Sequence, residues 1–216
     1  MKDWCELYTN DITNKGGPEQ YYNKKIKYRK SLLKKIKKYI IDGLVVEAGC
    51  GSGVLSIELA DSGYNAIAVD NDKRMLDILL KINKKVTKKR VTVMEEDIFN
   101  LDNSLKDKNI DVIFSVGVFE HFTDEQIIEL LKKQLKISKY VFVAIPTMYF
   151  NDNEALYGNE RFMPYKKWRL LINEANGKII EEFSCQNQNF FGIIKNVKKY
   201  FRPAPIRVFV VKGNCK

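Results

Sequence analysis

Residues 45–53 of the 216-residue chain read V-V-E-A-G-C-G-S-G. A short apolar run ends at an acidic residue, and three glycines, Gly49, Gly51 and Gly53, follow at alternate positions. Glycine reaches backbone angles that other residues avoid, and because it has no Cβ it lets the main chain approach a ligand closely. A strand that breaks into such a loop and then starts a helix is typical of a nucleotide-sized crevice at the carboxyl edge of a parallel sheet.

Outward from this loop, strand-like and helix-like apolar patterns alternate. Strands are predicted at 44–47, 66–70, 91–94, 111–116, 140–145, 178–183 and 207–211, and helices at 54–62, 73–83, 124–135 and 165–175. In the helix at 73–83, five apolar residues are expected to face the sheet: Met75, Leu76, Leu79, Leu80 and Ile82. The alternation predicts an α/β fold, a single doubly wound and mostly parallel seven-stranded sheet with helices on both faces and the last strand antiparallel.

The first part of the chain lies outside this alternation. Residues 1–20 contain the breaker Gly16-Gly17-Pro18 and are expected to be irregular, whereas residues 19–41 show helical spacing with lysines on one face. We therefore divide the chain into an N-terminal helical extension, residues 1–43, and a main domain, residues 44–216. A further short helix is expected at 192–200.

Composition favours a globular protein, since 45% of the residues are hydrophobic and 30% are charged. No apolar run reaches the length of a membrane span, and the first residues do not resemble a signal peptide. The four cysteines are scattered without a C-x-x-C pair, which predicts neither a disulfide framework nor a zinc site. We expect a cytoplasmic protein, monomeric or homodimeric, that does not bind membranes and holds no metal.

The net charge of +10 is unevenly distributed. Residues 1–45 carry 11 Lys/Arg against 5 Asp/Glu, and residues 193–216 carry seven basic residues and no acid. These stretches would make any contact with a polyanion such as RNA. The alternative is a lysine-rich surface that is simply solvated, because aromatic residues do not interleave with arginine as in a stacking platform.

The glycine loop is not a dinucleotide-binding loop, because residues 51–56 lack the last glycine of G-x-G-x-x-G. Glu47 followed by Gly49, Gly51 and Gly53 instead resembles the first motif of class I S-adenosylmethionine-dependent methyltransferases, especially the small-molecule enzymes. Pyrophosphate prefers a helix N-terminus without a nearby acid. A ligand with a sulfonium and an ammonium group is positively charged at these groups and therefore tolerates a carboxylate close by.

Further motifs support the resemblance, which runs from about residue 39 to residue 211. Asp70 ends the second strand, where a carboxylate accepts hydrogen bonds from ribose hydroxyls, a feature that NAD enzymes share. Asp97 follows the third strand, where this family places an acid against the adenine amino group. Residues 114–122, F-S-V-G-V-F-E-H-F, resemble the family's "VLEH" segment. The resemblance implies a Rossmann-like methyltransferase fold and adds four residues to the cofactor site: Asn71, Ile98, Val116 and Tyr21.

Each acidic residue also has a purely structural interpretation. Glu47 could cap its own loop, Asp70 could be a turn residue, and Asp97 could cap a short turn, with Glu96 a rival for its role. Cys50 is interpreted as a small residue that fills the loop rather than as a reactive thiol.

Catalytic and acceptor residues follow from the resemblance. His121, the only histidine, and Glu120 are candidate catalytic residues beside the cofactor, and the alternative is that they shape the loop. Tyr21 and Tyr22 lie on a segment that closes over the cofactor in related enzymes, or else pack the first helix. The segment 147–164 is expected to build the acceptor pocket, with four candidate substrate-binding residues: Tyr149, Tyr157, Arg161 and Phe162.

The function that these patterns favour is transfer of a methyl group from S-adenosyl-L-methionine, by in-line displacement, to an oxygen or nitrogen of a small molecule, with S-adenosyl-L-homocysteine as product. Three alternatives stay open: an RNA or protein methyltransferase that uses the basic ends, a non-catalytic relative that only binds the cofactor, and a dehydrogenase. The chain lacks the Asn/Asp-Pro-Pro-Tyr/Phe motif of nucleobase amino-methylation after the fourth strand, and also the cysteine nucleophile of cytosine-C5 methylation.

Overall fold

Seven strands form one sheet in the order β3-β2-β1-β4-β5-β7-β6. The computed structural model describes residues 3–146, 159–185 and 206–213. The strands are β1 (Leu44–Ala48), β2 (Ala66–Asp70), β3 (Thr92–Glu95), β4 (Ile110–Val116), β5 (Ser138–Pro146), β6 (Lys178–Ser184) and β7 (Ile206–Lys212). The helices are α1 (Trp4–Asn14), α2 (Pro18–Lys37), α3 (Val54–Asp61), α4 (Lys73–Val86), α5 (Leu101–Ser104), α6 (Asp124–Ile137) and α7 (Tyr165–Glu174), with short 3₁₀ turns η1 (Ile98–Asn100) and η2 (Phe119–His121).

The topology confirms the predicted doubly wound sheet. Strand β1 pairs in parallel with β2 and β4, β2 with β3, and β4 with β5. Strand β7 runs antiparallel to both of its neighbours, β5 and β6. The chain order reverses direction across the sheet between β1 and β4, and in open α/β sheets ligands bind at the carboxyl ends of the strands beside such a point.

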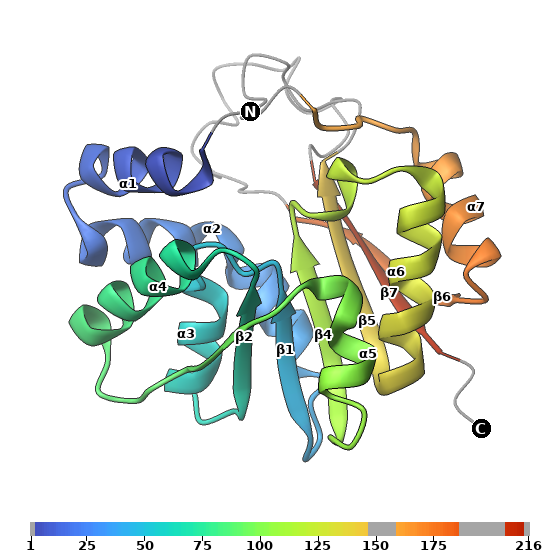
Figure 1. Cartoon of the computed structure of the whole chain (residues 1–216), viewed down its shortest axis with the longest axis horizontal. Helices are drawn as coiled ribbons and strands as arrows, with labels where there is room; N and C mark the ends of the chain where they lie inside the picture. Colours follow the sequence, from blue (N-terminus) through green and yellow to red (C-terminus); the bar gives the residue numbers. More distant parts are fainter. Residues whose placement is uncertain (1–2, 147–158, 186–205, 214–216) are drawn as a thin grey trace, which may run out of the picture.

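Helices cover both faces of the sheet, as Figure 1 shows. Helices α2, α3 and α4 pack on one face, and α5, α6 and α7 pack on the other. The side chains of Val45 and Val46, neighbours on β1, point into these two different hydrophobic clusters, and both are fully buried. Strands buried on both faces require continuous apolar runs, which explains why the strands are so readable in the sequence.

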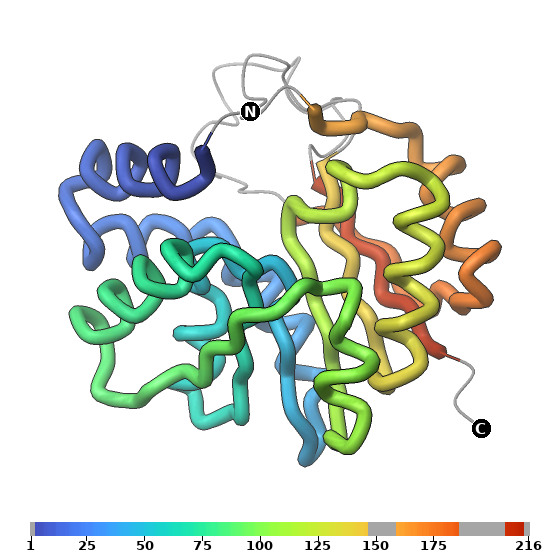
Figure 2. Tube along the Cα trace, in the orientation of Figure 1, coloured from blue at the N-terminus to red at the C-terminus, as the bar shows by residue number. Residues whose placement is uncertain are grey.

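The prediction that residues 1–20 are irregular is wrong, because α1 occupies residues 4–14 of this segment. Asp3 caps the helix by accepting the N–H of Cys5. The apolar face of α1 is narrow, with Trp4, Tyr8 and Ile12 spaced four residues apart and packed against the core. In Figures 1 and 2, α1 lies beside α4 and α2 at the end of the molecule where the parallel strands finish.

Two further expectations need correction. Leu80 does not face the sheet but lies on the outer side of α4 with 42% of its surface exposed. The helix predicted at 19–41 ends at Lys37. The buried carboxylate of Asp111 accepts the backbone N–H groups of Ile41, Asp42 and Gly43, and this turn cannot form while the helix continues. The helix expected at 192–200 lies outside the described residues.

Candidate functional site

The glycine loop joins β1 to α3, and all three of its glycines have left-handed backbone angles. The φ values are +73° at Gly49, +52° at Gly51 and +62° at Gly53. A Cβ on Gly53 would lie 1.9 Å from the side chain of Leu79, and one on Gly49 would lie 2.7 Å from Val118. The loop therefore needs glycine both for its backbone angles and for its close contacts with neighbouring elements.

Glu47 lies at the end of β1 and is 95% buried, with a relative exposure of 5%. Its Oε2 accepts hydrogen bonds from the backbone N–H of Ser56 at 3.0 Å and from the Ser56 hydroxyl at 2.5 Å. The carboxyl group thus caps the first turn of α3, which is a structural role but differs from the loop cap that the sequence suggested. Burial raises the pKa of Glu47 to about 7, so the group is poised between its neutral and charged forms near neutral pH.

Asp70, at the tip of β2, holds the loop from the neighbouring strand. Its Oδ2 accepts the N–H of Gly51 at 2.8 Å, and its Oδ1 accepts the N–H of Asp72 at 3.1 Å. Burial raises the pKa of this carboxyl group above its usual value. Asp70 is therefore a turn residue and a loop anchor at once, and a carboxylate with two backbone donors still has lone pairs for a ligand.

The third strand tip carries three acidic residues in a row, Glu95, Glu96 and Asp97, and the last two have different partners. Asp97 is exposed and caps η1 by accepting the N–H of Phe99 at 2.9 Å. Glu96, its rival, accepts the Ser104 hydroxyl at 2.5 Å. Of the two flanking candidates for the cofactor site, Ile98 is buried and Asn71 is exposed. Of Glu96 and Asp97, Asp97 is the more exposed, and Glu95 is exposed as well.

A small cavity of about 80 Å³ adjoins the glycine loop. Its lining comes from α1, α2, the loop, the start of α3 and the end of β4, namely Tyr8, Tyr21, Lys25, Arg29, Glu47, Cys50, Ser52, Val54, Leu55 and Val116. The structure thus brings together Glu47, Tyr21 and Val116, three of the residues predicted from sequence. The hydroxyl groups of Tyr21 and Ser52 lie 3.0 Å apart, which ties α2 to the loop. Burial raises the pKa of the Cys50 thiol, as expected of a loop-filling residue.

Tyr8 on α1 is a site residue that the sequence analysis missed. Its hydroxyl oxygen lies 2.9 Å from the position that a Cβ of Gly51 would occupy. The sequence pattern that could have revealed this helix is the four-residue spacing of Trp4, Tyr8 and Ile12 after the N-cap residue Asp3. A second missed residue, Arg29, lines the same cavity and carried no distinguishing signal among the basic residues of its helix.

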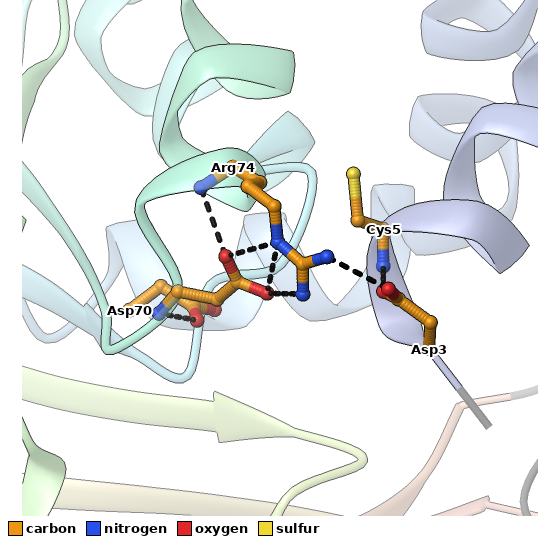
Figure 3. A network of polar contacts seen from close by, with 5 residues as sticks. Asp3, Cys5, Asp70 and Arg74 are labelled. Atoms are coloured by element: carbon orange, nitrogen blue, oxygen red, sulfur yellow. Dashed lines mark hydrogen bonds and ion pairs between the residues drawn. The ribbon is translucent and has the colours of Figure 1, made fainter. Parts of the chain in front are cut away.

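An ion pair fastens α1 beside the acidic strand tip. Arg74, in the first turn of α4, reaches Asp3 at 2.7 Å and its own N-cap residue Asp72 at 2.6 Å. Figure 3 shows the guanidinium group of Arg74 between these two carboxylates, with Asp70 joined to the backbone of Asp72. The start of α1 and the tip of β2 are therefore connected through one arginine.

The loop after β4 presents the two catalytic candidates. Glu120 is 3% exposed, and its Oε2 has no hydrogen-bond partner within the described ranges. Burial raises the pKa of Glu120 to about 8. His121 lies on the same turn, where its Nδ1 is 2.9 Å from Oδ1 of Asn159. The rings of His121 and Trp4 are perpendicular, and their centroids are 5.5 Å apart.

The acceptor residues are only partly placed. Tyr149 and Tyr157 lie outside the described residues, and Phe162 is partly buried. The guanidinium group of Arg161 donates to the carbonyl oxygen of Phe122 and to the carboxylate of Asp124, both at 2.5 Å. Its charge is thus already paired within the protein.

No helix in the ranges 3–146, 159–185 and 206–213 is long and apolar enough to cross a membrane. Among the same residues, His, Cys, Asp and Glu side chains do not gather in threes as a metal site would require.

Residues 45–139 match the family model of a methyltransferase domain. Phosphoethanolamine N-methyltransferase 3 of Arabidopsis thaliana is 25% identical over 138 residues, which are 61% of this chain and 27% of that protein. Phosphoethanolamine N-methyltransferase 1 of Triticum aestivum is 28% identical over 105 residues, 46% of this chain and 20% of that protein. The chain spans about a quarter of the length of these curated relatives.

Solved structures share the fold at low sequence identity. Magnesium protoporphyrin IX methyltransferase from Synechocystis PCC 6803, crystallised with bound S-adenosylmethionine, is 14% identical with a TM-score of 0.64, covering 90% of this chain and 81% of that one. A methyltransferase from Archaeoglobus fulgidus is 18% identical with a TM-score of 0.61, and the match covers 89% of this chain and 99% of that one. The segment that matches the family model contains the glycine loop and all three acidic strand tips, and this part of the chain is similar to a methyltransferase domain.

Proposed function

We propose that this chain transfers the methyl group of S-adenosylmethionine to an oxygen or nitrogen atom of a small-molecule acceptor and releases S-adenosylhomocysteine. One observation supports this above the others: β1, β2 and β3 each carry an acidic residue at or next to their last position, Asp70 holds the left-handed glycine loop through Gly51, and Glu47 lines the cavity beside that loop. A carboxylate at the glycine loop suits the sulfonium and ammonium groups of S-adenosylmethionine better than it suits the pyrophosphate of a dinucleotide.

The proposed roles follow the strand tips. Asp70 takes the ribose hydroxyls through its remaining lone pairs, flanked by Asn71. Asp97 takes the adenine amino group, with Ile98 packed beside the ring. The methionine end of the cofactor is held by six residues: Glu47, Gly49, Gly51, Gly53, Val116 and Tyr21.

The chemistry is an in-line displacement. A lone pair of the acceptor attacks the methyl carbon, the bond from carbon to sulfur breaks, and its electron pair stays on sulfur as a neutral thioether. Alignment of the two reactants supplies much of the acceleration, because the sulfonium is already a good leaving group. Positive charge leaves the sulfur during the reaction, so a site that excludes water favours the transition state.

A base is needed only when the acceptor atom carries a proton at the working pH. Glu120, with its pKa raised to about 8 by burial, is mostly protonated at neutral pH and is a hydrogen-bond donor there. His121 is the other group on this turn that we assign to receive a proton, and its contacts with Asn159 and Trp4 fix the orientation of its ring.

Residues 1–43 are proposed to close over the cofactor. Three contacts support this role: Tyr8 against Gly51, Tyr21 with Ser52, and Asp3 with Arg74. Together they join α1 and α2 to the glycine loop and to the tip of β2. Closure of such a segment would exclude water from the reacting atoms.

A small-molecule acceptor is supported by the relatives, which are named for phosphoethanolamine and for magnesium protoporphyrin IX. The segment 147–164 remains our proposal for the acceptor pocket. In it the charge of Arg161 is already paired with Asp124, which argues against Arg161 as an anion-binding residue.

The proposal is tested by incubating the full chain with methyl-labelled S-adenosylmethionine and a cell extract, then separating small molecules, RNA and protein. Label is expected in the small-molecule fraction, and it should disappear when Asp70→Ala replaces the wild type. Label that accumulates in RNA would support the alternative that rests on the basic ends of the chain. Absence of label from every fraction, with intact cofactor binding, would indicate a non-catalytic relative.

A further inference from the structure

Arg29 is a cation that forms no ion pair with the described residues of the chain. It lies on α2, two turns after Tyr21, and its side chain lines the cavity beside the glycine loop. The residue is partly buried. Its guanidinium group also makes no hydrogen bond with a residue of the described ranges.

The other arginines of the described residues behave differently. Arg74, Arg161, Arg169 and Arg207 each pair with an aspartate or glutamate at 2.5–2.8 Å, and Arg90 is exposed to solvent. Lys25, the second cation in the cavity lining, lies 3.3 Å from Asp11 of α1. Among the described residues, Arg29 is therefore the partly buried arginine that has no ion-pair partner.

Removing a cation from water is costly unless an anion or several hydrogen bonds compensate it. Burial lowers the pKa of Arg29, while the neighbouring Cys185, Tyr8, Glu47 and Tyr21 act in the opposite direction. The Glu47 carboxyl group is already engaged by Ser56 and is only half ionised near neutral pH, so its compensation is incomplete. A cation in such surroundings is suited to meet an anion that a ligand brings.

We propose that Arg29 is the anion-binding residue of this site, with its guanidinium group holding a carboxylate or phosphate group of the bound ligand. The guanidinium is planar and presents paired donors, which match two oxygens of such a group. The inference rests on the proposed function. The anion is either the carboxylate at the methionine end of the cofactor or an acidic group of the acceptor.

The test uses calorimetry on the full chain and on the variants Arg29→Met and Arg29→Lys. Lys30→Met is the matched control, because it removes one positive charge from the adjacent, exposed position of the same helix. Three probes are titrated: S-adenosylhomocysteine, 5′-methylthioadenosine, which lacks the amino-acid end, and inorganic phosphate added to protein saturated with S-adenosylhomocysteine. Circular dichroism confirms that each variant is folded.

If Arg29 holds the cofactor carboxylate, Arg29→Met should weaken the binding of S-adenosylhomocysteine about tenfold to a hundredfold. The binding of 5′-methylthioadenosine should be unchanged. Arg29→Lys should recover part of this loss, because lysine keeps the charge but not the paired donors. If the anion belongs to the acceptor, S-adenosylhomocysteine should bind normally, and phosphate should bind to the wild type and the Lys30→Met control but not to Arg29→Met.

The proposal is overturned when Arg29→Met binds both S-adenosylhomocysteine and phosphate as the wild type does, or when Lys30→Met causes the same losses. Failure of the wild type to bind S-adenosylhomocysteine at all would instead refute the proposed function. The two failures are therefore distinguishable in one set of titrations.

Discussion

The carboxylate of Asp70 accepts the backbone N–H of Gly51 at 2.8 Å and thereby joins the tip of β2 to the glycine loop that follows β1. The bond gives the loop its position relative to the acidic edge of the sheet. It also explains why one side chain can serve the fold and the ligand together, since the same carboxylate is the proposed partner of the ribose.

Loss of this relationship should abolish cofactor binding in a folded protein. Asp70→Ala removes the carboxylate, and Gly51→Val forces a side chain into a backbone position with a φ of +52° and into contact with Tyr8. For each variant we expect at least about a hundredfold weaker binding of S-adenosylhomocysteine, since a charge-assisted pair and the loop geometry are both lost. Asp77→Ala, at an exposed position of α4, is the control. Unchanged isotherms for Asp70→Ala and Gly51→Val would remove both residues from the site.

The Asp3–Arg74 ion pair should control how long the cofactor stays bound. Both side chains are largely exposed, at 41% and 57%, so the pair is screened by water and salt. We predict that Asp3→Asn raises the dissociation rate of S-adenosylhomocysteine about threefold at low salt and that the difference vanishes at high salt. The measurement is stopped-flow fluorescence. A salt-independent effect, or no effect on dissociation, would show that α1 does not act as a closing segment.

Glu120 should make stability depend on pH. Because burial raises its pKa to about 8 in the folded chain, its stabilising contribution is full below its unfolded pKa and is lost as the pH rises through about 8. Glu120→Gln removes this ionisation. The variant's free energy of unfolding, relative to the wild type, should therefore increase from about pH 5 to about pH 9.

Urea unfolding at several pH values measures this difference, with the exposed Glu174→Gln as control. If the gap between Glu120→Gln and the wild type does not change with pH, or narrows toward alkaline pH, Glu120 does not carry the proposed buried proton.

The turn before β1 should depend on Asp111. Its Oδ2 accepts three backbone N–H groups at 2.7–3.0 Å, and its Oδ1 lies 2.6 Å from the Lys139 ammonium group. Asp111→Ala leaves these donors without a partner and should cost about 2–4 kcal/mol of unfolding free energy. Although burial alone would raise it, the hydrogen bond from Lys139 and the three N–H groups hold the pKa of Asp111 below its usual value, so this stabilisation should be lost as the pH falls into the acidic range.

Thermal and urea unfolding at neutral and acidic pH test the effect. Asp107→Ala, at an exposed turn position, provides the comparison. A variant Asp111→Ala as stable as Asp107→Ala would mean that the backbone turn holds itself without the carboxylate.

The sheet was readable from sequence because strands buried on both faces are continuous apolar runs, and each strand that ends in an acidic residue marks the ligand edge. Helix α1 could not be read in the same way, because the residues that pack on the core, mainly Trp4, Tyr8 and Ile12, form only a narrow stripe in a short segment. The misplacement of Leu80 has a similar origin, since the apolar stripe of α4 is wider than the face it buries.

The site residues also divide into those that local sequence patterns reveal and those that only the packing of helices brings into place. Asp70 and Glu47 could be placed because strand ends converge on one edge, whereas the approach of Tyr8 to Gly51 and the position of Arg29 depend on how α1 and α2 pack across the sheet. Such long-range packing leaves no local pattern in the chain. The structure also gives Glu47 and Asp97 the capping roles that their positions allowed, alongside the ligand roles that we propose.

The most direct test of the account is calorimetric titration of S-adenosylhomocysteine and S-adenosylmethionine into the purified full chain and its Asp70→Ala variant. We predict one binding site per chain for both compounds in the wild type and no measurable heat in the variant. Absence of binding to the wild type, or equal binding to both proteins, would contradict the assignment of the acidic strand tips and glycine loop as the adenosyl site.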